Sequence, residues 1–117
     1  MVTERLGTMH MDIVEVAKHS CMPASKLRYY EEKGLIASVG RLGLRRTFDA
    51  GVLDQLKLVS LGQAAGFSLD EIAQMFPADG RTRVGKKTLA TNADKVDALV
   101  IGLRGMSKRL RLAADSV

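Results

Sequence analysis

The sequence predicts a mainly α-helical protein: a helix-turn-helix head with a small β-hairpin, followed by a long C-terminal coiled-coil helix. Three observations predict this fold. Two short helical patterns lie only a few residues apart, a stretch rich in glycine and arginine follows them, and a seven-residue apolar repeat runs through the last third of the chain. With 117 residues, the chain can form one small domain and an attachment, but not two full-sized cores.

The first helix is predicted from a capping box at Asp12. Its carboxylate can accept hydrogen bonds from the amides of the first turn, while Glu15 reaches back to the amide of Asp12. Ile13 and Val16 then share one face of the helix. The preceding residues, 1–11, are expected to be flexible.

The second helix is predicted from Ala24 to about Lys33. Pro23 precedes it with a fixed φ that suits a helix start, and Gly34 suits the left-handed residue that ends a helix. Tyr30 lies about a turn from Leu27 and is expected in the core. Two short helices joined so closely form a helix-turn-helix candidate.

Helical spacing disappears from Leu35 to Phe48. Glycines and arginines there lie between β-prone ends, so we expect a β-hairpin, or wing. Its basic residues are Arg41, Arg45 and Arg46.

Two further helices complete the predicted head, which spans residues 12–76. Asp49 is expected to cap the third helix, whose predicted core face comprises Val52, Leu53, Leu56, Val59 and Leu61. A second capping box, from Ser68 to Glu71, opens the fourth helix. Its expected inward residues, before Pro77 stops the helix, are Leu69, Ile72, Ala73 and Phe76.

Residues 77–85 are rich in helix breakers and are predicted to be a linker to a helix over 86–114. The apolar stripe of this helix has no second layer to cover it within so short a chain, so a second copy of the chain is its expected partner. The homodimer interface is therefore predicted to comprise Leu89, Val96, Leu99, Leu103, Met106 and Leu110.

Composition narrows the possible functions. A net charge of +5, from 18 Lys and Arg against 13 Asp and Glu, makes a polyanion a reasonable partner. One cysteine and two histidines cannot form a disulfide framework or a four-ligand zinc site, and no cofactor is expected. No apolar run approaches membrane-spanning length, so we expect a cytoplasmic, nucleoid-associated protein and no membrane partner.

The segment from Ala24 to Ile36 closely resembles the second helix of MerR-family regulators. The specific signal is the run from Arg28 to Glu31, followed by Gly34 and Leu35. The resemblance covers residues 12–76 and includes three more segments: 13–17, 45–49 and 66–72.

This resemblance implies a winged-helix homodimer that binds a pseudo-palindromic promoter element in double-stranded DNA, distorts it, and acts on transcription by RNA polymerase there. It also implies DNA contacts by Arg28 and Tyr29, and by a wing arginine, Arg46, or Arg45 if the register slips. Relatives often carry a basic residue near the end of the third helix, where this chain has Gln63. No catalytic role is expected.

The residue chemistry agrees with the DNA contacts. Polar side chains on the second helix can donate to base edges and phosphates in a major groove, and a basic hairpin can grip the flanking backbone. The full set of candidate DNA-binding residues is Ser25, Lys26, Arg28, Tyr29, Arg41, Arg45 and Arg46. The end of the second helix, from Glu31 to Lys33, is expected to be solvated.

Two questions stay open. A coiled-coil adaptor that keeps a helix-turn-helix shape without specific DNA binding is the alternative function, because fold does not fix function. The sequence does not identify the effector, the operator or whether transcription is activated or repressed.

Metal- and redox-responsive relatives carry several cysteines at and beyond the end of the dimer helix, and this sequence has none there. Cys21 lies in a turn where relatives usually have glycine, so we expect a structural role and no response to thiophilic metals.

Overall fold

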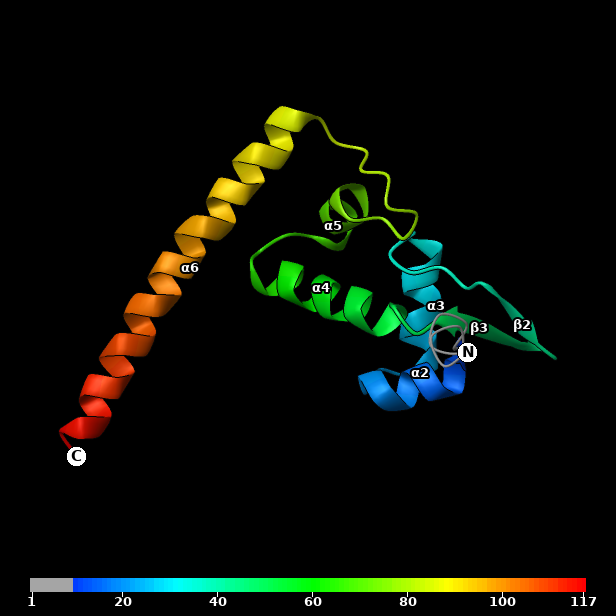
Figure 1. The fold of residues 1–117 in the computed structure, drawn as a ribbon, viewed down its shortest axis with the longest axis horizontal. Coiled ribbons are helices and arrows are strands. Elements are labelled where there is room, and N and C mark those ends of the chain that lie inside the picture. Colours follow the sequence, from blue (N-terminus) through cyan, green and yellow to red (C-terminus); the bar gives the residue numbers. More distant parts are fainter. Residues whose placement is uncertain (1–9) are drawn as a thin grey trace, which may run out of the picture. The chain divides into compact units, whose positions relative to one another are not determined.

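The computed structural model describes residues 10–117 and divides the chain into two units, a head that ends at Arg83 and a C-terminal unit, Val84–Val117 (Figure 1). Residues 1–9 of the segment predicted to be flexible lie outside the described residues. The last two residues of that segment form a short strand instead, β1 (His10–Asp12), in which Met11 is buried.

The helix-turn-helix consists of α2 (Ile13–Ser20) and α3 (Ala24–Glu32). The capping box predicted at the start of α2 is confirmed: the Glu15 amide donates to Asp12 Oδ1 at 2.9 Å, and the Asp12 amide donates to Glu15 Oε1 at 3.0 Å. Gly34, which follows α3, has the expected left-handed conformation, with a φ of 81°. Tyr30 is buried in the core, as predicted.

The turn between α2 and α3 places a cysteine in a conformation that favours glycine. Cys21 is the C-cap of α2 with a φ of 60°, and within residues 10–117 no other non-glycine residue has a positive φ. A left-handed conformation brings Cβ close to the following carbonyl oxygen, which costs roughly 1–2 kcal/mol outside glycine. The backbone of Cys21 is therefore strained in a turn conformation that glycine would adopt without strain.

Replacing Cys21 with glycine should stabilise the protein. We expect Cys21→Gly to raise the free energy of unfolding by about 1 kcal/mol, because the strain at Cβ is removed without loss of a buried contact. Cys21→Ser keeps Cβ and is the control, with little expected change. Urea denaturation of both variants measures the effect, and a Cys21→Gly variant no more stable than wild type would show that the turn is unstrained.

The predicted wing belongs to a three-stranded antiparallel sheet. Its hairpin is formed by β2 (Gly40–Leu42) and β3 (Arg45–Asp49), and β3 lies between β1 and β2. Buried Phe48 pairs with Met11 of β1, which joins the wing to the start of α2.

The third predicted helix is α4 (Val52–Ala64), and two of its predicted features are wrong. Pairing with β1 extends β3 to Asp49, so this residue ends a strand, and its carboxylate accepts from the amide of Gly51 at 3.0 Å instead of capping α4. Leu61 is 67% exposed. It lies well round the helix from Leu56, because five residues at about 100° each do not return to the same face.

The fourth predicted helix is α5 (Leu69–Met75), and its capping box is confirmed, with the Glu71 amide donating to Ser68 Oγ at 3.1 Å. Ile72 is fully buried and packs against Gly62 of α4, where a Cβ would lie only 2.7 Å from Ile72 Cδ1. Phe76 was expected to point inward but is exposed, because the chain leaves the helical conformation there.

Most of the predicted linker is tied to the head. The amide of Ala78 donates to the carbonyl of Gly34 at 2.9 Å, and the amide of Arg83 donates to the carbonyl of Gln74 at 2.8 Å. Residues 77–83 therefore continue the head and brace the end of α3.

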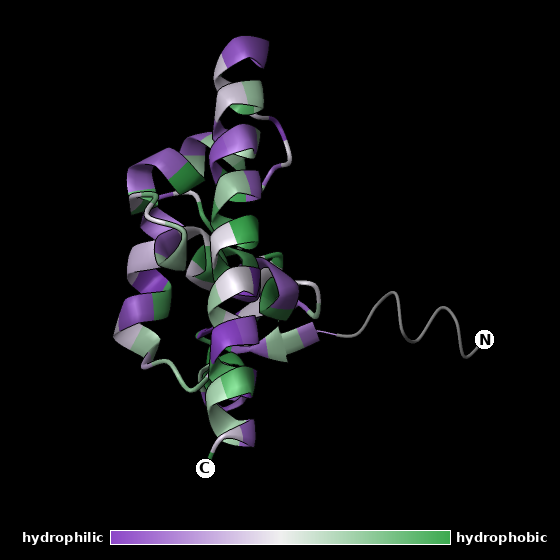
Figure 2. Cartoon of the chain, turned by 90° about the vertical axis from the view of Figure 1, so that its left-hand side faces the viewer, coloured by the Kyte–Doolittle hydropathy of each residue, from purple (hydrophilic) through white to green (hydrophobic). Residues whose placement is uncertain are grey.

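The C-terminal unit is a single continuous helix, α6 (Lys86–Asp115), 30 residues long. None of its residues is buried within the chain, and Figure 2 shows apolar positions recurring along its length. Five predicted interface residues are exposed: Val96, Leu99, Leu103, Met106 and Leu110. The predicted fold class, a winged helix-turn-helix head with a long C-terminal helix, is confirmed. Among residues 10–117, no helix combines the length and apolar character needed to cross a membrane.

Candidate nucleic-acid interface

The outer face of α3 presents every candidate DNA-binding residue predicted on this helix. Leu27 and Tyr30 anchor the inner face in the core. The positions before and between these two residues are exposed, and they carry the predicted candidates Ser25, Lys26, Arg28 and Tyr29. The helix therefore offers hydroxyl, ammonium, guanidinium and phenol donors on one surface.

Arg28 is available for an external partner. Within residues 10–117, its exposed guanidinium makes no ion pair or hydrogen bond. An unpaired arginine on an exposed helix face can donate to a phosphate or, in two parallel bonds, to the acceptor edge of guanine.

Lys33, at the C-terminal end of α3, packs over the ring of Tyr29. The Lys33 ammonium lies 5.5 Å from the Tyr29 ring centroid and 2.6 Å from the Asp70 carboxylate of α5. The Asp70 carboxylate accepts from Lys33 and raises the pKa of that ammonium. The expectation that Lys33 belongs to a solvated helix end is therefore wrong, because it links α3 to α5.

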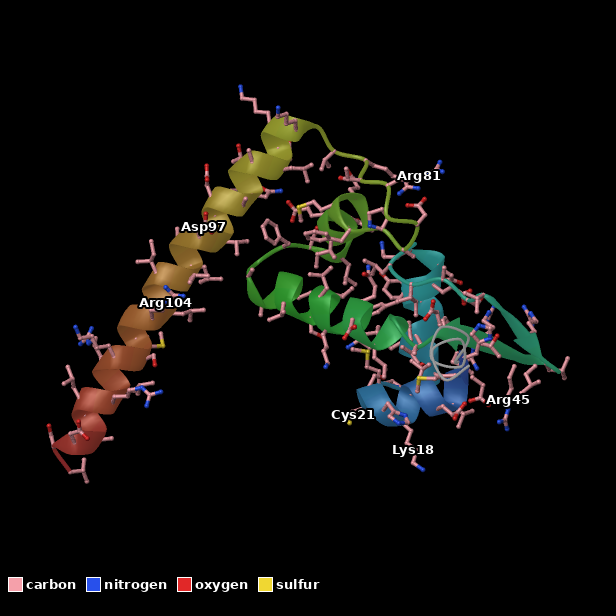
Figure 3. All side chains as sticks on the ribbon, viewed as in Figure 1. Lys18, Cys21, Arg45, Arg81, Asp97 and Arg104 are labelled. Atoms are coloured by element: carbon pink, nitrogen blue, oxygen red, sulfur yellow. The ribbon has the colours of Figure 1, made fainter. Side chains whose placement is uncertain are left out.

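The three wing arginines lie on the two opposite faces of the hairpin. Arg41 and Arg46 are paired across β2 and β3, so they share a face, while Arg45 alternates to the other face. Arg45 donates from Nη1 to Asp12 Oδ2 at 3.1 Å, and its side chain remains largely exposed (Figure 3). The wing is thus anchored to the start of α2.

Arg46 is anchored to α3 through Glu31, a residue expected to be solvated. Arg46 Nε lies 3.0 Å from Glu31 Oε1, and Ser38 Oγ donates to Glu31 Oε2 at 2.7 Å. The sequence contained a signal for this role: Glu31 lies four residues after buried Leu27, on the inward side of α3, where a carboxylate requires a partner.

The Asp12 carboxylate serves both the α2 cap and the wing. The Glu15 amide that donates to it lowers the pKa of Asp12 below its ordinary value, burial opposes this shift, and the hydrogen bond and charge of Arg45 lower the pKa further. A carboxyl group whose pKa is lower in the folded state stabilises the fold above the unfolded-state pKa. This contribution disappears as pH falls through the folded-state pKa.

The greater folding stability of wild type relative to Asp12→Asn should therefore be lost at acidic pH. Asparagine can cap a helix but lacks the charge that pairs with Arg45. We expect wild type to be more stable than the variant at about pH 6, and the difference to disappear only as pH falls from about 4 towards about 2, because the folded-state pKa of Asp12 lies below its ordinary value. Thermal unfolding of both proteins across this range measures the difference, and a gap that is unchanged at about pH 2 would contradict the role of the charge.

Two protein-family models match this sequence. The family model "MerR HTH family regulatory protein" matches residues 11–79, and the model "MerR, DNA binding" matches residues 53–111. This chain belongs to the MerR family. The first match covers most of the head, and the second extends from α4 through most of α6.

Curated relatives in the MerR family are transcriptional regulators. The chain is 32% identical over 96 residues to the HTH-type transcriptional activator SoxR homolog of Chromobacterium violaceum, covering 74% of this chain and 65% of the relative. It is 30% identical over 112 residues to the HTH-type transcriptional regulator CueR of Salmonella typhimurium, covering 91% and 80%. The chain thus spans slightly less than two thirds of the SoxR homolog.

Solved MerR-family structures share the fold. HiNmlR, described as a MerR family regulator lacking the sensor domain and bound to promoter DNA, matches with a TM-score of 0.63 at 22% identity, over 89% of this chain and 84% of its own. A MerR-family regulator from Bacillus cereus matches with a TM-score of 0.57 at 20% identity, over 87% and 75%. These structures share the fold, and the family models with the curated relatives show that the chain is a MerR-family DNA-binding transcriptional regulator.

Two positions at which the sequence was expected to depart from its relatives are exposed. Gln63 lies near the end of α4, and its neutral amide supplies no cation to a phosphate. Cys21 is exposed in the turn after α2. Across residues 10–117, no three His, Cys, Asp or Glu side chains gather closely enough to hold a metal ion.

Proposed function

We propose that this MerR-family regulator binds a pseudo-palindromic promoter element as a homodimer and distorts the DNA between the two half-sites, where RNA polymerase acts. The observation that carries the proposal is the donor-rich outer face of α3 beside a wing of which two arginines, Arg45 and Arg46, are anchored to the helix-turn-helix. A helix of this kind fits the major groove, and phosphate contacts from flanking elements fix its register.

The residues divide into two roles. Arg28 and Tyr29, with Ser25 and Lys26 beside them, contact base edges and phosphates in the major groove. The wing arginines contact flanking phosphates, with Arg46 as the principal contact supported by Arg41 and Arg45. Phosphate contacts supply affinity for any sequence, whereas base contacts supply the choice of sequence.

The second copy of the chain covers the exposed apolar stripe of α6. In an antiparallel pair centred near Ile101, Val96 of one copy faces Met106 of the other, and Leu99 faces Leu103, because these pairs are equidistant from Ile101 in the sequence. Each apolar layer is then completed by the other copy. Two heads held in one dimer can bind two symmetry-related half-sites.

A gel-shift titration against competitor DNA tests the proposal. Labelled fragments from the promoters that flank the gene for this protein are titrated, with unlabelled random-sequence DNA in excess. We expect at least one fragment to remain bound at competitor levels that release the others. Uniform release of every fragment would favour the alternative adaptor, which keeps the helix-turn-helix shape without choosing a sequence.

A further inference from the structure

The Glu31 carboxylate joins three parts of the head. It lies on α3 and contacts Arg46 of β3, with Nε and Oε1 3.0 Å apart, and it accepts at 2.7 Å from Ser38, which precedes β2. The side chains of Glu31 and Arg46 are only 22% and 35% exposed. Both carboxylate oxygens are engaged, so the position of the wing arginine is linked to that of the recognition helix.

A carboxylate at this place is unfavourable for binding to a polyanion unless it serves another purpose. Its charge repels phosphates, and its pairing with Arg46 reduces the positive charge of the wing. If charge alone mattered, a chain without Glu31 would bind all DNA more tightly. The cost is offset if the carboxylate holds Arg46 in the geometry that a phosphate requires.

The geometry of the ion pair suits such a function. Arginine has five donors, and the closest contact with Glu31 is made by Nε. Within residues 10–117, Glu31 is the only partner of the Arg46 side chain, which is 35% exposed, so the guanidinium remains accessible to a phosphate. Fixing the long side chain before binding reduces the entropy lost when that contact forms.

The anchor of Arg46 differs from that of Arg45. Asp12, which holds Arg45, precedes α2, whereas Glu31 lies on the helix whose outer face carries Arg28 and Tyr29. The contact between Glu31 and Arg46 therefore links the wing residue that contacts phosphates directly to the helix that contacts bases. Because phosphate contacts set the register of base contacts, disturbing this coupling affects specific binding more than non-specific binding.

We propose that Glu31 is a positioning residue that determines specificity: it holds Arg46 against α3, so that the wing and the recognition helix engage the DNA in one register. The proposal rests on the proposed function, in which both elements contact DNA. The negative charge of Glu31 weakens binding to any DNA, whereas its contact with Arg46 strengthens binding to the specific element. The two effects can therefore be separated by measuring both affinities.

The experiment compares Glu31→Gln with wild type on two DNA duplexes at the same salt concentration: an element selected from a random library by wild-type protein, and a random-sequence duplex. Affinity for the selected element should fall about 3- to 10-fold, whereas affinity for the random duplex should stay unchanged or rise. Glu32→Gln is the matched control. It removes the same charge from an exposed neighbour that makes no ion pair within residues 10–117 and should shift both affinities equally.

Two further variants isolate the contact. In an Arg46→Ala background, Glu31→Gln should leave the ratio of the two affinities unchanged, because its partner is already absent. Ser38→Ala, which frees one carboxylate oxygen, should lower that ratio in the same direction by a smaller amount and provides a second test if Glu31→Gln is poorly folded.

The outcomes separate this proposal from the function on which it rests. Equal gains in both affinities in Glu31→Gln would show that Glu31 acts only through its charge. Equal losses together with a lowered melting temperature would show a purely structural role, and either result overturns the proposal while leaving the function intact. Absence of any sequence preference in wild type would overturn both.

Discussion

Arg28→Ala is expected to weaken binding to the specific element by about 1–3 kcal/mol. The guanidinium is exposed on the outer face of α3 and makes no ion pair or hydrogen bond within residues 10–117, so its removal leaves the helix intact and removes only external contacts. Charge-assisted hydrogen bonds to DNA are among the stronger polar contacts that a side chain can make. Fluorescence anisotropy with labelled duplex measures the loss.

A matched variant controls for charge. Arg81→Ala also removes one exposed positive charge, but from the segment after α5 and not from the outer face of α3 (Figure 3). It should change affinity only slightly, through the reduced net charge. A folded Arg28→Ala protein that binds as tightly as wild type would remove Arg28 from the interface.

The double substitution of Leu99 and Leu103 by aspartate is expected to convert the dimer to monomers. Both leucines are exposed in the single chain and lie on the stripe that the proposed second copy would cover, so four carboxylates would enter the interface of one dimer. Monomers cannot hold two half-sites together, and affinity for the two-half-site element should fall by at least tenfold. Sedimentation velocity and anisotropy measure the two effects.

Ile101 provides the control for this variant. Its side chain is 72% exposed, and its heptad position places it away from the stripe, so Ile101→Asp should stay dimeric. If the variant with both leucines replaced also sediments as a dimer, the interface lies elsewhere on the chain.

The direction of the pair can be determined by cross-linking in a Cys21→Ser background. The proposed antiparallel arrangement would place residue 96 opposite residue 106, so a protein with cysteines at both positions should form interchain disulfides. Neither Val96→Cys nor Met106→Cys alone should do so, because each cysteine then faces an unmodified residue. Efficient cross-linking of Val96→Cys alone would indicate parallel helices.

Local signals in the sequence predicted local structure well. Both capping boxes and the left-handed Gly34 depend on residues within one helical turn of each other, so their chemistry is visible in the sequence alone. The exposed candidates on α3 followed from the same periodicity that buries Leu27 and Tyr30.

Features that depend on distant pairing were missed. Strand β1 has three residues, too few to show an alternating pattern, and it exists because β3 pairs with it. The same pairing moved the start of α4 beyond Asp49. The partners of the wing arginines, Asp12 and Glu31, are far from them in the chain, so the sequence identified the arginines but not what orients them.

Selection of DNA sequences from a random duplex library tests the central claim most directly, because it assumes no operator. If a dimer reads DNA through two copies of α3, the recovered sequences should share two inverted half-sites. Their centres should lie about 34–36 Å apart along the duplex, or a multiple of that distance. Enrichment should be lost with Arg28→Ala. A wild-type pool that contains no common sequence, or only a single half-site without symmetry, would contradict the account.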